Sequence, residues 1–219
     1  MINILNMDYK IHDDWCKDFY SKYINENDKV CVLAFSYRQS QISNLEEWSL
    51  FYGPDEGSYY KGIVEAYMAF GINEDNISFV NYYIHSIEQM QSMISESTIL
   101  YLPGGIPTGF FDKIIEKDLL STISNYEGVV IGCSAGAMIQ MDEYFISPDK
   151  DYPTYSLEKG MGLLSGFGVE AHFSNEKHQL DSIYKYINDK KLPVYGLSDD
   201  GVLVVEKDKI ILFGSVEVF

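Results

Sequence analysis

Short apolar runs alternate along this chain with segments in which apolar residues recur at helical spacing. The apolar runs are rich in β-branched residues and predict buried strands at residues 29–36, 76–83, 98–102 and 128–133. The segments between them predict helices at residues 56–70, 84–95 and 109–126. Gly71 follows the first of these helical segments and is a typical helix stop.

Strands that alternate with helices predict crossover connections, and therefore a mostly parallel sheet with helices on both faces. The C-terminal part differs, because residues 201–206 (GVLVVE) and 210–214 (IILFG) are separated only by Lys207, Asp208 and Lys209, as in a β-hairpin. We predict a single α/β domain over residues 1–219. It is a three-layer sandwich with a mostly parallel sheet and an antiparallel C-terminal hairpin at the edge.

The charge balance excludes several classes of partner. The 219 residues include 16 Lys and Arg against 33 Asp and Glu, which gives a formal net charge of −17. Binding to nucleic acid or to an anionic membrane surface needs clustered basic residues, so we expect neither partner. Hydrophobic residues make up 46% of the chain and aromatic residues 15%, and this composition argues against intrinsic disorder.

The number of cysteines and the length of the apolar runs indicate the cellular compartment. Cys16, Cys31 and Cys133 are too few and too widely spaced for a disulfide framework or a zinc site. No apolar run approaches the length of a membrane-spanning helix, and the first residues do not have the pattern of a signal peptide. We therefore expect a cytoplasmic protein that needs no metal and no organic cofactor, and the sequence leaves a homodimer open.

The sharpest local signal is the segment GVVIGCSAGAMI at residues 128–139. An apolar strand runs into Gly132, Ser134 and Gly136, and a helix-like stretch follows, which matches G-x-S-x-G in a strand–turn–helix context. A nucleophile on such a turn sits in strained backbone and needs small neighbours two positions away. Ser134 is thus the candidate nucleophile, and the N–H of Ala135 is a candidate oxyanion donor at the helix start. The alternative is a glycine-rich turn that only packs a helix against the sheet.

A second glycine turn, at Pro103, Gly104 and Gly105, follows another predicted parallel strand. Ligands of open α/β sheets bind beyond the carboxyl ends of the strands, so this turn should lie beside Ser134. Gly105 N–H is the candidate second oxyanion donor, and Gly104 is a further candidate for substrate binding. A plain strand–helix turn would have the same sequence. The neighbouring Cys133 could be mistaken for a thiol nucleophile, but we expect it to point into the core.

Four motifs in order give the chain a family resemblance: LPGG, IGCSAGA, GLLSGFGVEAHF and VYGLSDDGVLVV. Together they cover about residues 98–214, and they resemble the peptidase E and cyanophycinase group of serine peptidases. The resemblance implies a fold similar to that of class I glutamine amidotransferases. It also implies a serine-type hydrolase that acts on a small peptide.

The resemblance places the nucleophile on Ser134 and the general base on His172. Histidine is the residue type that this chemistry needs, because its pKa lets it take the proton from a serine hydroxyl near neutral pH. The other histidines, His12, His85 and His178, are expected at surface or structural positions.

Two carboxylates compete to orient the histidine. Asp199 falls where the resembling family commonly has a glutamate after a strand, and Asp149 falls where the family has an aspartate 15 residues after its nucleophile. We favour Asp199, because it follows an apolar stretch and should reach a sheet end near His172. Asp149 stays the alternative, since its polar segment also reads as a solvated loop.

The residues that would select the substrate differ between this chain and the resembling family. Peptidase E cleaves peptides with an N-terminal aspartate, and that group usually carries arginines after its His-Phe pair. In this chain the corresponding segment has none, and Arg38 is the only arginine. Lysine replaces a bidentate arginine poorly, so aspartyl specificity is in doubt and a neutral or cationic substrate fits the acidic chain better. Two alternatives to a serine hydrolase stay open: a silent binding or regulatory domain, and a hydrolase that uses Cys133.

Overall fold

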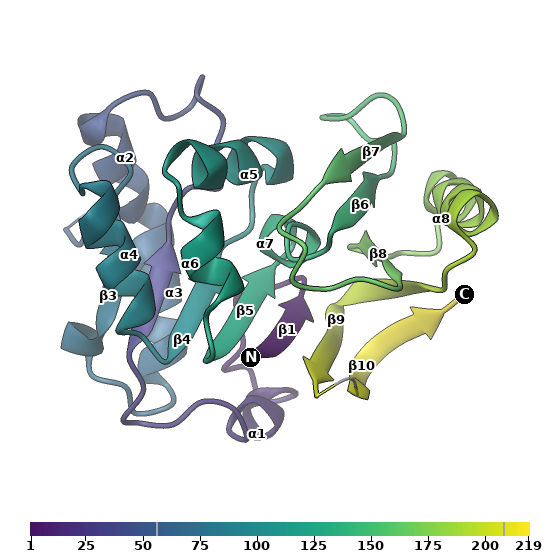
Figure 1. Cartoon of the computed structure of the whole chain (residues 1–219). Coiled ribbons are helices and arrows are strands. Elements are labelled where there is room, and N and C mark those ends of the chain that lie inside the picture. The colour runs from purple at the N-terminus through teal and green to yellow at the C-terminus, as the bar shows by residue number, and fades with distance from the viewer. Residues whose placement is uncertain (56, 208) are drawn as a thin grey trace.

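A twisted sheet forms the centre of the molecule (Figure 1). The computed structural model describes residues 1–55, 57–207 and 209–219. Within these residues eight strands form one sheet in the order β10-β9-β1-β5-β4-β2-β3, with β8 paired to β9. Their bounds are β1 Ile2–Asn6, β2 Val30–Leu33, β3 Ile77–Val80, β4 Ile99–Leu102, β5 Val129–Cys133, β8 Gly168–Ala171, β9 Val194–Glu206 and β10 Lys209–Val218.

Strand directions confirm the predicted mostly parallel sheet with an antiparallel C-terminal hairpin. Strands β1, β5, β4, β2 and β3 pair in parallel, whereas β9 runs antiparallel to both β1 and β10. The first part of β9 also pairs in parallel with β8, so this long strand joins the C-terminal hairpin to the parallel core. Residue 208, in the predicted hairpin turn, lies outside the described residues.

Helices cover both faces of the sheet, which gives the predicted three layers (Figure 1). One face packs against α4, α5 and α6, and the other against α1, α2 and α3, each through its own buried apolar cluster. The helices are α1 Lys17–Tyr20, α2 Leu45–Tyr52, α3 Ser58–Met68, the 3₁₀ turn Glu74–Asn76, α4 Ile87–Ser95, α5 Pro107–Glu116, α6 Leu120–Ser124, α7 Ala135–Met138 and α8 Lys177–Lys190.

A small unit beyond the main sheet completes the fold. The strands β6 (Glu143–Ile146) and β7 (Ser156–Lys159) form an antiparallel ribbon. Helix α8 packs beside this ribbon through a third cluster, which includes Phe145, Phe173 and Tyr186. Within the part of the chain that the structure describes, no helix is both long and apolar enough to cross a membrane.

The three predicted helices differ from the observed helices in their bounds. The stretch 109–126 contains two helices, because Asp118 adopts a left-handed φ of 50° and ends the first helix before α6 begins. The stretch 84–95 becomes helical only at Ile87, because Ser86 and Gln89 form a capping box at that point. Helix α3 starts at Ser58, and the predicted start at residue 56 lies outside the described residues.

The N-terminal strand β1 was not predicted, although it lies inside the sheet between β5 and β9. Its sequence, INILN, carries two asparagines whose side chains are buried. Asn3 Nδ2 donates to Gln140 Oε1 at 3.0 Å, and Asn6 Nδ2 donates to Tyr20 Oη at 2.6 Å. These partners come from distant segments, so a local hydropathy pattern does not reveal that the asparagines can be buried.

The turn after β5 depends on close backbone packing at Gly136. A Cβ atom built on Gly136 would lie 1.9 Å from the carbonyl oxygen of Leu102 in β4. Glycine therefore lets the short helix α7 approach the sheet edge, as the G-x-S-x-G motif predicts.

We predict that Gly136→Ala lowers the free energy of unfolding by about 3 kcal/mol or more, because backbone must move to admit the methyl group. Urea denaturation measures the change. Gly109→Ala in α5 is the matched control: its nearest neighbours lie 3.6 Å from the new Cβ, so its stability should stay equal or rise slightly. Equal stability of the two variants would contradict the account of this turn.

Candidate active site

Ser134 occupies the sharp turn between β5 and α7. Its backbone has φ 49° and ψ −109°, a region that residues other than glycine rarely adopt. The Ser134 N–H donates to the carbonyl oxygen of Asn6 in β1 at 2.8 Å, and its carbonyl accepts from Ala137 and Met138 in α7. The turn is thus bonded on both sides, and the hydroxyl projects beyond the carboxyl end of the strand.

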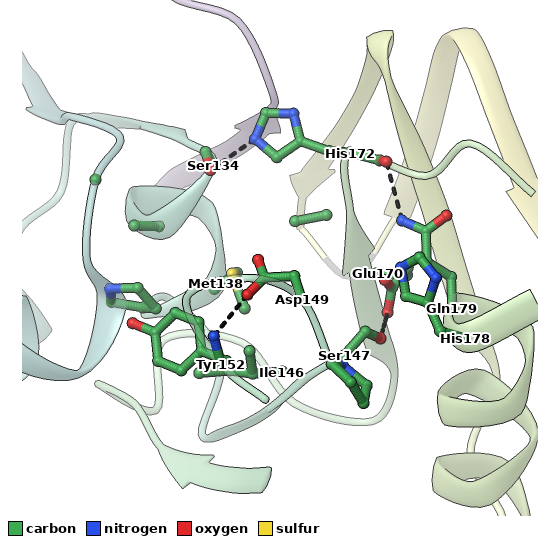
Figure 2. Close-up of a pocket in the computed structure, with 15 residues that line it drawn as sticks. Ser134, Met138, Ile146, Ser147, Asp149, Tyr152, Glu170, His172, His178 and Gln179 are labelled. Atoms are coloured by element: carbon green, nitrogen blue, oxygen red, sulfur yellow. Dashed lines mark hydrogen bonds between the residues drawn. The ribbon is translucent and has the colours of Figure 1, made fainter. Parts of the chain in front are cut away.

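His172 follows the end of β8 and faces Ser134 (Figure 2). Its Nε2 lies 2.8 Å from Ser134 Oγ. The histidine backbone is also left-handed, with φ 51°. Gln179 Nε2 donates to the His172 carbonyl at 3.0 Å, and Phe173 N–H donates to Leu197 O at 2.8 Å, so the surrounding structure holds this conformation.

Asp199 lies on the opposite side of the imidazole from Ser134. Its Oδ1 is 2.6 Å from His172 Nδ1, which joins the three side chains in one hydrogen-bonded series. Ser198 Oγ donates to Phe173 O at 2.8 Å and ties β9 to the histidine segment. Both side chains are open to solvent, with exposed fractions of 51% for His172 and 75% for Asp199. The adjacent Asp200 instead accepts from Ser215.

Asp149, the alternative carboxylate, forms hydrogen bonds within its own loop. Its Oδ1 accepts from the N–H groups of Asp151 at 2.7 Å and Tyr152 at 2.6 Å. The hydrogen-bond partners of the His172 ring are Ser134 and Asp199. Asp149 nevertheless lines the same cavity as Ser134 (Figure 2).

The residues predicted around the oxyanion differ in their surroundings, because Gly105 and Ala135 border the cavity at Ser134 and Gly104 does not. Gly105 and Ala135 line the cavity together with Ser134. Gly105 has φ 140°, and a Cβ there would lie 2.1 Å from Ser36 O, so this turn needs glycine. Gly104 borders a different cavity, which also contains Cys133 and Tyr101.

Cys133 points into the protein, as predicted. Its side chain is buried, and burial raises the pKa of the thiol to about 12, so the sulfur stays protonated at neutral pH.

The cavity beside Ser134 measures about 200 Å³ and contains residues that the sequence analysis missed. Among them are Glu170, Gln179 and His178; His178 is exposed, as expected, yet it also borders the cavity. Glu170 is buried at 4% exposure, and its Oε2 accepts from Ser147 Oγ at 2.7 Å (Figure 2). Glu170 could have been identified from the sequence, because it is a charged residue inside the apolar run 166–171, two positions before His172.

Burial raises the pKa of Glu170 to about 7, against the opposing hydrogen bond from Ser147. Between pH 4.5 and about 7 the folded protein therefore holds a proton at Glu170 that the unfolded chain releases. Stability falls as pH rises through this window.

We predict that Glu170→Gln, which removes this titration, loses less stability than the wild-type protein between pH 5 and pH 8. The difference should be on the order of 3 kcal/mol at most. Urea denaturation at both pH values measures it, with Glu65→Gln on the exposed side of α3 as the charge-matched control. Parallel pH profiles for the wild-type protein and Glu170→Gln would contradict the assigned shift.

Comparisons with known proteins identify the family and the fold of this chain. The family model of peptidase family S51 matches residues 53–213, which is more than half of the chain. A comparison with curated protein sequences finds no match.

Two solved structures share the fold. One is a provisionally named peptidase E protein from Listeria monocytogenes EGD-e, with TM-score 0.67, 14% identity and 98% of both chains covered. The other is a peptidase from an acI-B1 Actinobacterium, with TM-score 0.57, 16% identity, and 99% of this chain and 88% of the other covered. These two structures show the fold, and the match to the family model shows that the chain belongs to peptidase family S51, a family of serine-type peptidases.

Proposed function

We propose that the protein hydrolyses a peptide or amide bond through an acyl-enzyme on Ser134. The hydrogen-bonded series Ser134–His172–Asp199, with distances of 2.8 Å and 2.6 Å, is the observation that carries this proposal. A serine hydroxyl is a weak nucleophile until a base takes its proton, and the imidazole within hydrogen-bond reach is such a base.

The reaction then proceeds in two halves. Ser134 Oγ attacks the carbonyl carbon while His172 Nε2 takes the hydroxyl proton, and the carbonyl oxygen becomes an oxyanion. His172 returns the proton to the leaving amine as the bond to the amine breaks. Water, deprotonated by the same nitrogen, releases the acyl group from Ser134. Asp199 accepts the hydrogen bond from Nδ1–H and stabilises the imidazolium that forms in each half.

The oxyanion lies between the two glycine turns in this proposal. The N–H groups of Ala135 and Gly105 supply the hydrogen bonds, because both residues border the cavity at Ser134. Ala135 is the first residue of α7, where free N–H groups point away from the helix.

Aspartyl specificity is not part of this proposal. Among the described residues that line the cavity there is no lysine and no arginine, whereas Asp149 and Glu170 are both present. An acidic side chain would meet two carboxylates and no fixed cation.

We predict that Ser134→Ala lowers kcat for peptide hydrolysis at least about a thousandfold, because the acyl-enzyme cannot form. Turnover of a short-peptide library measures the loss. Cys133→Ala is the matched control from the neighbouring position, and it should keep its activity, because a buried protonated thiol takes no part. Activity lost in Cys133→Ala and kept in Ser134→Ala would instead favour the cysteine-dependent hydrolase.

A second pair of variants separates the two carboxylates. We predict that Asp199→Ala lowers kcat about a hundredfold or more, since the imidazole loses the group that orients it. Asp149→Ala should affect KM more than kcat, because Asp149 lines the cavity without contacting His172. The opposite ranking of the two kcat values would show that Asp149 supports the histidine during catalysis.

A further inference from the structure

The cavity beside Ser134 contains a buried carboxyl group for which the reaction above has no use. Glu170 lies on β8, His172 follows the end of that strand, and both residues line the cavity. The hydrogen bond from Ser147 Oγ to Oε2 holds the carboxyl in place. Figure 2 shows Glu170 across the cavity from Ser134, with Ser147 below it.

The walls between Ser134 and Glu170 are mostly apolar. Met138 from α7, Ile146 from the end of β6 and Ala171 from β8 line the space, and the ring of Tyr152 lies beside them. A volume of about 200 Å³ accommodates an aliphatic chain of several methylene groups. Such a chain gains binding free energy by burying its stem against these walls, while its polar end reaches the carboxyl group of Glu170.

Three basic side chains outside the cavity lining have partners of their own. Arg38 pairs with Asp151 at 3.1 Å, and Lys177 is 92% exposed and pairs with Asp181 at 3.5 Å. Lys113 Nζ donates to the carbonyls of Tyr37 and Gly109. The Glu170 carboxyl therefore faces the cavity without a lysine or arginine partner among the described lining residues.

We propose that this cavity holds the side chain of the residue whose carbonyl Ser134 attacks, and that Glu170 selects a lysine-type or arginine-type side chain there. This inference rests on the proposed serine-hydrolase function and names its substrate class. A cationic group that ends a long aliphatic stem supplies the partner that a buried carboxylate needs. An aspartate side chain is too short to fill the cavity and has the same charge as Asp149 and Glu170.

The test uses amino-acid phosphonate diphenyl esters, which mimic the acyl residue and bond covalently to an active serine. Ser134 Oγ attacks phosphorus and phenol leaves, so the rate of adduct formation reports on the side chain directly. The probes carry the lysine, norleucine or aspartate side chain, and intact-protein mass spectrometry follows the reaction. At pH 8 we expect the lysine probe to react about tenfold to a hundredfold faster than the norleucine probe, with aspartate slowest.

The variant Glu170→Gln tests the residue itself. It should lower the lysine-to-norleucine rate ratio toward one, because an amide keeps the size of the side chain but not its charge. The control is Glu65→Gln, which removes an equal charge from the exposed side of α3 and should keep the wild-type ratio. An equal fall in both variants would assign the preference to the general field and overturn the role of Glu170.

A second test uses the wild-type protein alone and measures how the lysine-to-norleucine rate ratio depends on pH. The pKa of Glu170, raised by burial to about 7, implies that the lysine preference grows between pH 6 and pH 8 as the carboxyl ionises. Effects of pH on the attack by Ser134 act on both probes and cancel in the ratio. The other titratable groups around Glu170 are Asp149, Tyr152 and Tyr155 from the loop after β6, and Glu176 and His178 at the start of α8. A ratio that does not change with pH would overturn the proposal.

A simple fluorophosphonate separates this inference from the proposed function. If it labels Ser134 while the norleucine or aspartate probe reacts as fast as the lysine probe, or while no amino-acid probe reacts, the side-chain assignment is wrong and the serine chemistry stands. If it does not label Ser134, both proposals fail.

Discussion

The left-handed backbone at Ser134 is the constraint on which the rest of the site depends. A φ of 49° and a ψ of −109° cost on the order of 1–3 kcal/mol and persist only where neighbours hold them. Here β1 accepts the Ser134 N–H, and Gly136 lets α7 approach β4 closely. The same turn sends Cys133 into the core and Ser134 toward His172, so backbone geometry decides which of two adjacent nucleophilic side chains is available for chemistry.

Sheet topology then brings the remaining groups to this turn. Strands β4 and β5 run in parallel, so the Gly104–Gly105 turn and Ser134 lie at the same edge. The parallel pairing of β8 with the start of β9 sets Ala171 opposite Leu197, which brings His172 and Asp199 together across a sequence separation of 27 residues. The length of β9 matters because its later part pairs with β1, whose Asn6 holds the Ser134 turn.

Much of this arrangement could be predicted from local patterns, and each miss has its own physical cause. The strands at β2, β4 and β5 are short apolar runs, and the strand–turn–helix context of G-x-S-x-G led to the turn at Ser134. Strand β1 was missed because its buried asparagines find partners in distant segments. The break at Asp118 is a single backbone rotation that helical periodicity does not encode. The choice between Asp199 and Asp149 also required distances, since both carboxylates suited the sequence.

The central claim is that Ser134 is the nucleophile of a serine hydrolase, and mapping a covalent adduct tests it most directly. The folded wild-type protein is treated with a fluorophosphonate, digested and analysed by tandem mass spectrometry beside a known serine hydrolase. The account predicts one adduct, on Ser134, that is lost when the protein is unfolded before treatment. An adduct on Cys133 or another residue, or no adduct while the reference enzyme is labelled, would contradict it.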